Sequence, residues 1–300
     1  MVTSFVSFWD AYWLIVIVNR MGEGWQEKNG LLTCPCWGGF TDGWRVAYNG
    51  KMILITNDDG IQSEGIVKLY EELKQHYKVV VVAPDRERSA ISRALTLYRP
   101  LRVEKVGDDK FSVDGTPTDC VNLAVNSLFK NQIKMVVSGI NKGANMAEDI
   151  TYSGTVSAAM EGLLLGVPSI AISLAARENF LFETPAKFAN KLVKTILKKG
   201  LPYDTLLNVN VPNVAYSELK GIKITRMGKK RYSDTIIEKK DPRGKKYYWL
   251  GGEEMGYEKL GDSDMEAVFD GYVSITPIHL DLTNYSAMES LKSSLDLTID

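Results

Sequence analysis

The stretch MILITNDDGIQSEGI (residues 52–66) decides the fold prediction. Its first five residues form a short apolar run, which is typical of a strand buried on both faces of a sheet. From Ile66 onward apolar residues recur at helical spacing, and Ser63 can serve as the N-cap of that helix. The stretch therefore predicts a strand, a loop and a helix, with two adjacent carboxylates, Asp58 and Asp59, where the strand ends.

The same alternation of short apolar runs and amphipathic segments continues to about Pro212. It predicts further strands at 78–84, 134–141, 167–173 and 205–212, and further helices at 115–129, 153–166 and 184–200. The helix at 115–129 opens with a capping-box-like pair, Thr116 and Asp119, around Pro117. Strands and helices that alternate in this way predict an α/β fold, a doubly wound, mostly parallel sheet between two layers of helices. Residues 52–212 are expected to form this core.

Residues 213–300 follow a different pattern. Strand-like pieces at 221–226, 246–252 and 271–278 are separated by charged loops, and a last helix is predicted at 286–295. We expect a C-terminal extension rich in antiparallel β-hairpins. A basic segment (220–246) and an acidic segment (253–270) within it are expected to be solvated faces that attract each other within or between subunits. The alternative is that the basic segment steers a phosphorylated substrate.

Residues 1–51 carry five of the six tryptophans but show no strand or helix period. The apolar run Ala11–Val18 is much shorter than the roughly 20 residues of a membrane helix. A signal peptide would need positive charge before this run, but no Lys or Arg precedes Arg20. We expect an extension without packed structure of its own, or a wrongly assigned start. The competing interpretation is a short docked helix or a peripheral membrane anchor.

Composition narrows the class of protein. Hydrophobic residues make up 45% of the 300-residue chain, which is enough for a large core, and the net charge of −1 gives no electrostatic footprint for a nucleic-acid polymer. Three cysteines form no disulfide framework, so we expect a reducing, cytoplasmic environment. With only two histidines, a multi-histidine metal site is not expected.

Oxygen-rich loops follow three of the predicted strands, at 57–60, 84–89 and 138–145. Ligands of open parallel sheets bind outside the carboxyl ends of the strands, so these loops are expected to meet. Carboxylate, hydroxyl and amide oxygens without thiol or imidazole suit Mg²⁺, Mn²⁺ or Ca²⁺. A cation would also offset the repulsion between Asp58 and Asp59. Helix capping is the alternative role for this pair, although Ser63 can cap that helix by itself.

The segment Ser153-Gly154-Thr155 begins a predicted helix. It offers free backbone N–H groups, two hydroxyls and a glycine that allows close approach, which together favour phosphate binding. An ordinary Ser153 N-cap is the alternative. Asn145 could add a further donor. The sequence lacks the glycine patterns of dinucleotide-binding and P-loop proteins.

Five blocks, in the same order along Met52–Leu295, resemble the SurE (survival protein E) family of metal-dependent 5'-nucleotidases: ILITNDDGI, APDRERSA, VDGTPTDCV, VSGINKGANMAEDITYSGTVSAAMEG and YVSITPIHLDLTN. The resemblance implies a Rossmann-like core and a C-terminal extension that exchanges between subunits. It also implies a divalent metal held by Asp58, Asp59, Ser89 and Asn141, and a phosphate site at Asn145, Ser153, Gly154 and Thr155. The family often has Gly-His where this chain has Ser92-Arg93, so no histidine role carries over there.

The function predicted on this basis is metal-dependent hydrolysis of nucleoside 5'-monophosphates, with one Mg²⁺ or Mn²⁺ per subunit and Asp58 and Asp59 as catalytic residues. A metal-activated water and an aspartyl-phosphate intermediate both stay open. Nucleoside 3'-monophosphates and polyphosphate are further candidate substrates, and a non-catalytic nucleotide- or metal-sensing module is the alternative function. A homodimer or homotetramer is expected, without membrane or nucleic-acid partners.

Overall fold

The computed structural model describes residues 26–28, 31–33, 52–232, 236–250 and 254–295. The chain divides into two compact units, residues 1–43 and 44–300, and each is described by itself. In the first unit, β1 (Gln26–Lys28) and β2 (Leu31–Thr33) pair as an antiparallel hairpin. The expectations for Ala11–Val18, the cysteines at 34 and 36 and the rest of residues 1–51 lie outside the described residues and stay predictions.

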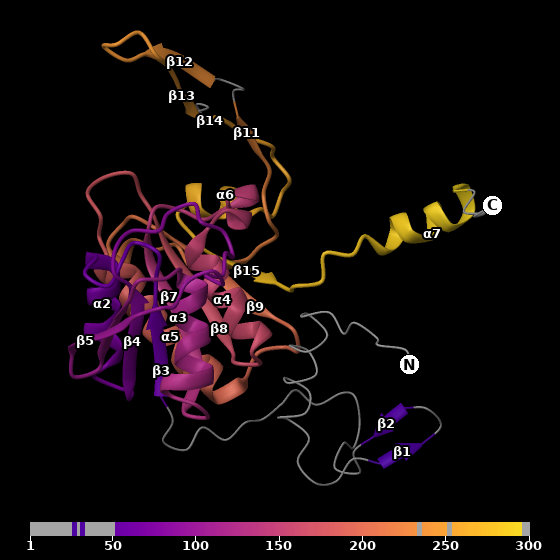
Figure 1. Cartoon of the computed structure of the whole chain (residues 1–300). Helices are drawn as coiled ribbons and strands as arrows, with labels where there is room; N and C mark the ends of the chain where they lie inside the picture. The colour runs from indigo at the N-terminus through magenta and orange to yellow at the C-terminus, as the bar shows by residue number, and fades with distance from the viewer. Residues whose placement is uncertain (1–25, 29–30, 34–51, 233–235, 251–253, 296–300) are drawn as a thin grey trace, which may run out of the picture. The chain divides into compact units, whose positions relative to one another are not determined.

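A nine-stranded sheet organises the second unit (Figure 1). The strand order is β10-β15-β9-β8-β7-β3-β4-β6-β5. The six strands from β9 to β6 run parallel, whereas β15 is antiparallel to β9 and β5 is antiparallel to β6. Their bounds are β3 (Met52–Thr56), β4 (Val79–Pro84), β5 (Val103–Gly107), β6 (Lys110–Val113), β7 (Ile133–Lys142), β8 (Ser169–Ala175), β9 (Leu206–Pro212), β10 (Ile222–Ile224) and β15 (Val273–Ile278).

Helices cover both faces of this sheet. In β3, Ile53 and Ile55 pack in one cluster with α2 (Glu64–Leu73) and α5 (Glu183–Lys199). Met52 and Leu54 face the opposite way, toward α3 (Pro117–Leu123), which continues as the π-helix η1 (Ala124–Leu128), and α4 (Gly154–Leu164). Because successive strand residues point to opposite faces, a strand buried on both sides must be largely apolar, as residues 52–55 are. The predicted three-layer, doubly wound α/β fold is confirmed.

Two of the predicted helix signals recur in the structure. Thr116 and Asp119 form a complete capping box at the start of α3, with Pro117 at the first helical position. Ser63 occupies the N-cap of α2, but its hydroxyl accepts a hydrogen bond from Asn57 Nδ2 (2.7 Å) instead of capping the helix. Ser63, and neither aspartate, is the N-cap residue of α2, whereas the Asp58 carboxylate accepts hydrogen bonds from the backbone N–H groups of Gly154 and Thr155 at the start of α4.

The hairpin β5–β6 at one edge of the sheet was not predicted. The residues of β5 are largely exposed and include Glu104 and Lys105, so the strand lacks the apolar run by which the other strands were recognised. Its partner β6 nevertheless pairs in parallel with β4 and extends the sheet beyond it.

The C-terminal segment divides between the main sheet and separate hairpins. As expected, two small antiparallel sheets form, between β11 (Lys230–Tyr232) and β14 (Glu254–Tyr257) and between β12 (Ile236–Lys240) and β13 (Lys246–Leu250). Strand β15, expected in the hairpins, instead lies between β9 and β10, because Val273 and Ile275 belong to the main core. The boundary at Pro212 therefore stays a prediction. The remaining elements are the 3-10 turns η2 (Ala147–Thr151) and η3 (Tyr216–Glu218) and the helices α6 (Asp264–Phe269) and α7 (Tyr285–Ser294).

No helix in the described part of the chain is both long enough and apolar enough to span a lipid bilayer.

Candidate active site

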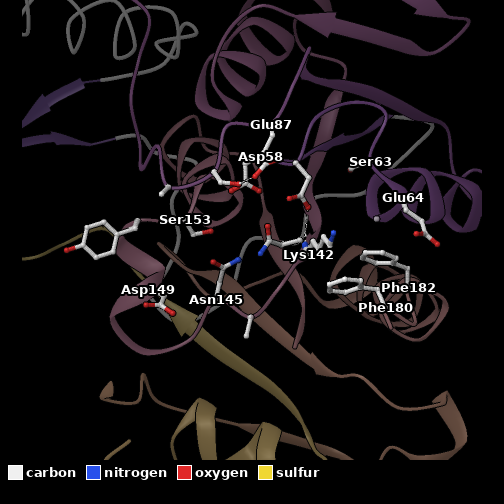
Figure 2. Close-up of a pocket in the computed structure, with 17 residues that line it drawn as sticks. Asp58, Ser63, Glu64, Glu87, Lys142, Asn145, Asp149, Ser153, Phe180 and Phe182 are labelled. Atoms are coloured by element: carbon white, nitrogen blue, oxygen red, sulfur yellow. Dashed lines mark hydrogen bonds between the residues drawn. The ribbon is translucent and has the colours of Figure 1, made fainter. Parts of the chain in front are cut away.

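A cavity of about 600 Å³ opens at the carboxyl ends of β3, β4 and β7 (Figure 2). After β3 the chain first builds the β4 side of the sheet and then returns to add β7, so the order reverses between β3 and β7. A reversal of this kind leaves a crevice where ligands bind. Six of the eight predicted site residues line the cavity: Asp58, Asp59, Ser89, Asn141, Asn145 and Ser153.

The other two predicted residues, Gly154 and Thr155, lie in the first turn of α4 behind Asp58. The Thr155 hydroxyl donates a hydrogen bond to Asp58 Oδ1 and lies 3.3 Å from Asn141 Oδ1. The resemblance implied that Thr155 binds phosphate. In the structure its side chain is fully buried and orients two predicted metal ligands from different strands.

Gly154 allows α4 to lie against the aspartate loop. A Cβ atom at this position would be 2.7 Å from the Cβ of Asp58, closer than carbon atoms can approach. A similar contact holds the other end of the helix, where a Cβ at Gly162 would be 2.2 Å from Ser169 Oγ of β8. The two glycines therefore let α4 pack closely at both of its ends, and the predicted role of Gly154 at a phosphate stays a prediction.

The surrounding groups of the folded chain only partly stabilise the negative charges of Asp58 and Asp59. Burial raises the pKa of Asp58, and hydrogen bonds from Thr155 only partly oppose this effect. Burial, and next the neighbouring Asp58 charge, raise the pKa of Asp59 to about 6, although the backbone N–H of Lys142 donates to Asp59 Oδ2 (3.0 Å). Both shifts mean that the carboxylate forms are disfavoured in the folded chain. A bound cation would reverse this.

Ser89 lies on the loop after β4, at a more exposed position than the aspartates. Its hydroxyl donates to Glu87 Oε1 (2.7 Å), which leaves the lone pairs of the Ser89 oxygen available to a cation. Glu87 also lines the cavity and contributes to the raised pKa of Asp59. The sequence predicted an oxygen-rich loop at 84–89 but gave no separate signal for Glu87.

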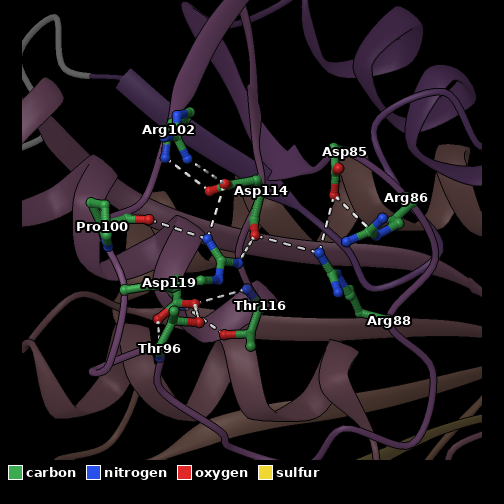
Figure 3. A network of polar contacts seen from close by, with 10 residues as sticks. Asp85, Arg86, Arg88, Thr96, Pro100, Arg102, Asp114, Thr116 and Asp119 are labelled. Atoms are coloured by element: carbon green, nitrogen blue, oxygen red, sulfur yellow. Dashed lines mark hydrogen bonds and ion pairs between the residues drawn. The ribbon is translucent and has the colours of Figure 1, made fainter.

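The chain that follows β4 and carries Ser89 is held to Asp114, just after β6, and to α3 by the polar network of Figure 3. Asp119 of α3 accepts hydrogen bonds from the Thr96 backbone (3.0 Å) and hydroxyl (2.6 Å). Arg99 pairs with Asp114 at 2.9 Å. Arg93, at the position where the family often has histidine, is exposed and is not among the cavity-lining residues.

Asn145 and Ser153 lie on the opposite side of the aspartates from Phe180 and Phe182 (Figure 2). Ser153 is the N-cap of α4, and its hydroxyl accepts from the backbone N–H of Val156 (3.1 Å). The Ser153 N-cap alternative is thus present, and the backbone N–H groups of Gly154 and Thr155 in the same turn hydrogen-bond to the Asp58 carboxylate. A helix start of this kind favours an anion.

The donor set fits a hard divalent cation. Among the described residues no cluster of three or more His, Cys, Asp or Glu side chains is arranged to hold a metal. The predicted set instead combines two carboxylates with neutral serine and amide oxygens. All four donors are oxygen, which suits Mg²⁺ or Mn²⁺ and not zinc or copper.

Sequence reasoning missed the aromatic wall at the other end of the cavity. Phe180 and Phe182, in the loop after β8, stack with ring centroids 5.7 Å apart and planes at 15°. Lys142 Nζ lies 4.8 Å from the centroid of the Phe180 ring. This loop contains Glu178 and Asn179, but it was not among the three oxygen-rich loops singled out from the sequence.

The fold and the cavity together define a Rossmann-like α/β protein whose cavity, at the point where the strand order reverses, is lined by carboxylate, hydroxyl and amide groups. The family model "Survival protein SurE" matches residues 53–234. The chain belongs to the SurE family, as the resemblance of its motifs indicated.

Curated relatives agree with this assignment. The chain is 51% identical to the 5'-nucleotidase SurE of Citrifermentans bemidjiense over 242 residues, which cover 80% of this chain and 98% of the relative. It is also 51% identical to the 5'-nucleotidase SurE of Aquifex aeolicus over 241 residues, 80% of this chain and 96% of the relative. The crystal structure of the SurE protein from Aquifex aeolicus superposes with a TM-score of 0.74 and covers 81% of this chain and 98% of that one.

Proposed function

We propose that this protein is a 5'-nucleotidase, a phosphoric monoester hydrolase that cleaves nucleoside 5'-monophosphates to nucleoside and phosphate. Membership of the SurE family and 51% identity to relatives named 5'-nucleotidase support the activity. The observation that carries the chemistry is the convergence of Asp58, Asp59 and Asn141 on one cavity beside the start of α4.

The proposed metal ligands are Asp58, Asp59, Ser89 and Asn141, and the proposed ion is one Mg²⁺ or Mn²⁺ per subunit. When bound, the ion would polarise the phosphoryl group and lower the pKa of a water molecule. Thr155 holds Asp58 and Asn141 in place, and the Lys142 backbone orients Asp59. Asn145 and Ser153 would bind the phosphate oxygens, and the backbone N–H groups of Gly154 and Thr155, which hydrogen-bond to Asp58 in the metal-free chain, are the further proposed donors. Asp58 and Asp59 are the proposed catalytic residues.

A substrate panel tests this assignment. Purified protein should release phosphate from nucleoside 5'-monophosphates with Mg²⁺ or Mn²⁺, and a chelator should abolish the release. Nucleoside 3'-monophosphates and polyphosphate belong in the same panel because the phosphate site itself does not distinguish them. A protein that binds nucleotide and metal but releases no phosphate between acid and alkaline pH would support the sensing module instead.

The cavity is larger than a phosphate group requires. Its volume of about 600 Å³ lies within the range of small-molecule sites, ~300–1,000 Å³. The half-buried ring of Phe180, stacked on the buried Phe182, offers an apolar surface to the rest of the substrate, and a nucleobase is a flat group that suits such a surface. This supports a nucleotide over a small phosphate ester.

Replacing Phe180 with Leu should raise the KM for a nucleoside 5'-monophosphate about five-fold while kcat changes less than two-fold. An aromatic pair contributes about 0.5–1.5 kcal/mol beyond its buried area, and leucine removes that part but keeps the apolar contact. Glycerol phosphate, which has no base, serves as the internal control and should keep its KM. An equal rise in KM for both substrates would show that Phe180 supports the cavity as a whole and does not contact the base.

We further propose that the working unit is a homodimer or homotetramer. The hairpin β12–β13 exposes Ile236, Trp249 and Tyr248, and α7 has no buried residue and exposes Tyr285 and Leu291. A second copy of the chain would cover these side chains and pair the exposed strand edges. The hairpin region is also tied to the cavity, because Lys230 of β11 forms an ion pair with Asp149, which lines it.

Replacing Trp249 with Asp should lower the molar mass measured by light scattering toward that of one chain. A charge placed in a desolvated apolar contact costs far more than one on an open surface. Lys245→Ala, in the same hairpin, is the matched control and should leave the mass unchanged. Truncation after Pro212 cannot serve this purpose, since it would remove β15 from the main sheet. A Trp249→Asp protein with the wild-type mass would contradict an interface at this hairpin.

A further inference from the structure

Two asparagines lie in the interior of the main sheet without serving the hydrophobic core. Asn208 and Asn210 of β9 are both fully buried, and they alternate with Val209 and Val211, which pack in the core on the opposite face. Asparagine is a poor strand former, and a buried amide costs free energy unless it is hydrogen-bonded. The packing of β9 therefore does not explain why these two positions are amides.

Their partners explain it. Asn210 forms a reciprocal pair with the backbone of Asn145: the Asn145 N–H donates to Asn210 Oδ1 (2.8 Å), and Asn210 Nδ2 donates to the Asn145 carbonyl (2.9 Å). Asn208 Nδ2 donates to the same carbonyl (2.8 Å). The side chain of Asn145 is held as well, because its Nδ2 donates to Ser173 Oγ of β8 (2.8 Å).

We propose that Asn208 and Asn210 are positioning residues that fix Asn145 for phosphate binding. This inference rests on the proposed function, in which Asn145 meets the phosphate. The loop that carries Asn145 leaves β7 and has no regular ladder at this point, so the two amides take the place of a neighbouring strand. The Asn210 amide supplies both groups at once, since its Nδ2 donates to the Asn145 carbonyl and its Oδ1 accepts from the Asn145 N–H. An apolar residue or a carboxylate at position 210 would lose one or both bonds.

Asn210→Leu tests this with little change of shape. It removes both the acceptor for the Asn145 N–H and the donor to the Asn145 carbonyl. Inorganic phosphate, titrated by calorimetry in saturating Mn²⁺, should bind at least ten-fold more weakly than to the wild type. The Kd for Mn²⁺ alone should change less than two-fold, because the variant touches none of Asp58, Asp59 and Asn141. Asn208→Ala removes one of the two donors to the Asn145 carbonyl and should weaken phosphate binding by a smaller factor.

Ser274→Ala is the matched control. Ser274 lies opposite Asn210 in β15, is equally buried, and bonds to Thr225 and not to Asn145. It should leave the Kd for phosphate unchanged whatever it does to the melting temperature. The proposal is overturned if Asn210→Leu and Asn208→Ala bind phosphate as the wild type does, or if Ser274→Ala weakens phosphate binding equally. Because the readout is phosphate binding, a wild-type protein that fails to hydrolyse nucleotides would refute the proposed function separately.

Discussion

Replacing Asp58 with Asn is expected to lower phosphate release from a nucleoside 5'-monophosphate by about 10³-fold, the scale of losing a main electrostatic contact to the transition state. The substitution keeps the shape of the side chain and an oxygen that can accept the hydrogen bond from Thr155. It removes one of the two negative charges that would hold the cation. Steady-state rates at saturating Mn²⁺ measure the effect, and Mn²⁺ titration should show a weaker Kd.

Asp109→Asn is the control for this substitution, since Asp109 is an exposed aspartate in the turn between β5 and β6. Its rate should stay within two-fold of the wild type. If Asp58→Asn kept most of the activity, Asp58 would have no essential role at the metal.

The same aspartates give the metal-free protein a pH dependence of known sign. The pKa of Asp59 is raised in the fold, from an ordinary 3.8 to about 6, so ionising it costs stability. The cost is absent below about pH 4, grows as the pH rises through 6, and is constant above that. Since the group is partly solvated, about 1–2 kcal/mol is a reasonable magnitude. Asp59→Asn should therefore melt at a higher temperature than the wild type at pH 8 without metal, and Mn²⁺ should raise its melting temperature much less.

The second large effect is expected from Gly154→Ala. The added methyl group would lie 2.7 Å from the Cβ of Asp58, so either α4 or the aspartate loop must move. A shift of this size at catalytic groups costs on the order of 10²-fold in kcat/KM. Because α4 also packs against the sheet through Gly162, we expect the loop to yield and the melting temperature to fall by only a few degrees.

Gly107→Ala controls for the general cost of adding a methyl group at a glycine. A Cβ at Gly107 would meet only the side chain of Lys110, at an ordinary 3.4 Å. This variant should retain full activity. Wild-type kcat/KM in Gly154→Ala would show that the close approach of α4 to Asp58 does not matter for catalysis.

Much of this architecture is predictable because its causes are local. The apolar runs at 52–55 and 79–84 are typical of strands buried on both faces, and the residues just after such parallel strands meet at one edge of the sheet. That is why the sequence alone predicted that Asp58, Asp59 and Asn141 lie close together, as they do in the cavity.

The features that escaped prediction depend on contacts between distant segments. Nothing in the local sequence indicates that the Thr155 hydroxyl turns inward to Asp58, or that Phe180 forms a wall of the cavity. Strand β15 looked like part of a hairpin because its neighbour β9 is about 60 residues away in sequence, and short strands carry no information about their partners. Asn208 and Asn210 did carry a signal, since two amides in a buried strand contradict its propensity, and such conflicts often mark functional sites.

The location of the metal is the most direct test of the central claim that the Asp58–Asp59 pair holds a catalytic cation. Crystals soaked in Mn²⁺ should give one strong anomalous peak per subunit within about 2.0–2.6 Å of oxygen atoms of Asp58, Asp59 and Asn141. The peak should vanish in Asp58→Asn at the same Mn²⁺ concentration. A protein that hydrolyses nucleotides with Mn²⁺ while the peak lies elsewhere, or with no peak at these aspartates, would contradict the account.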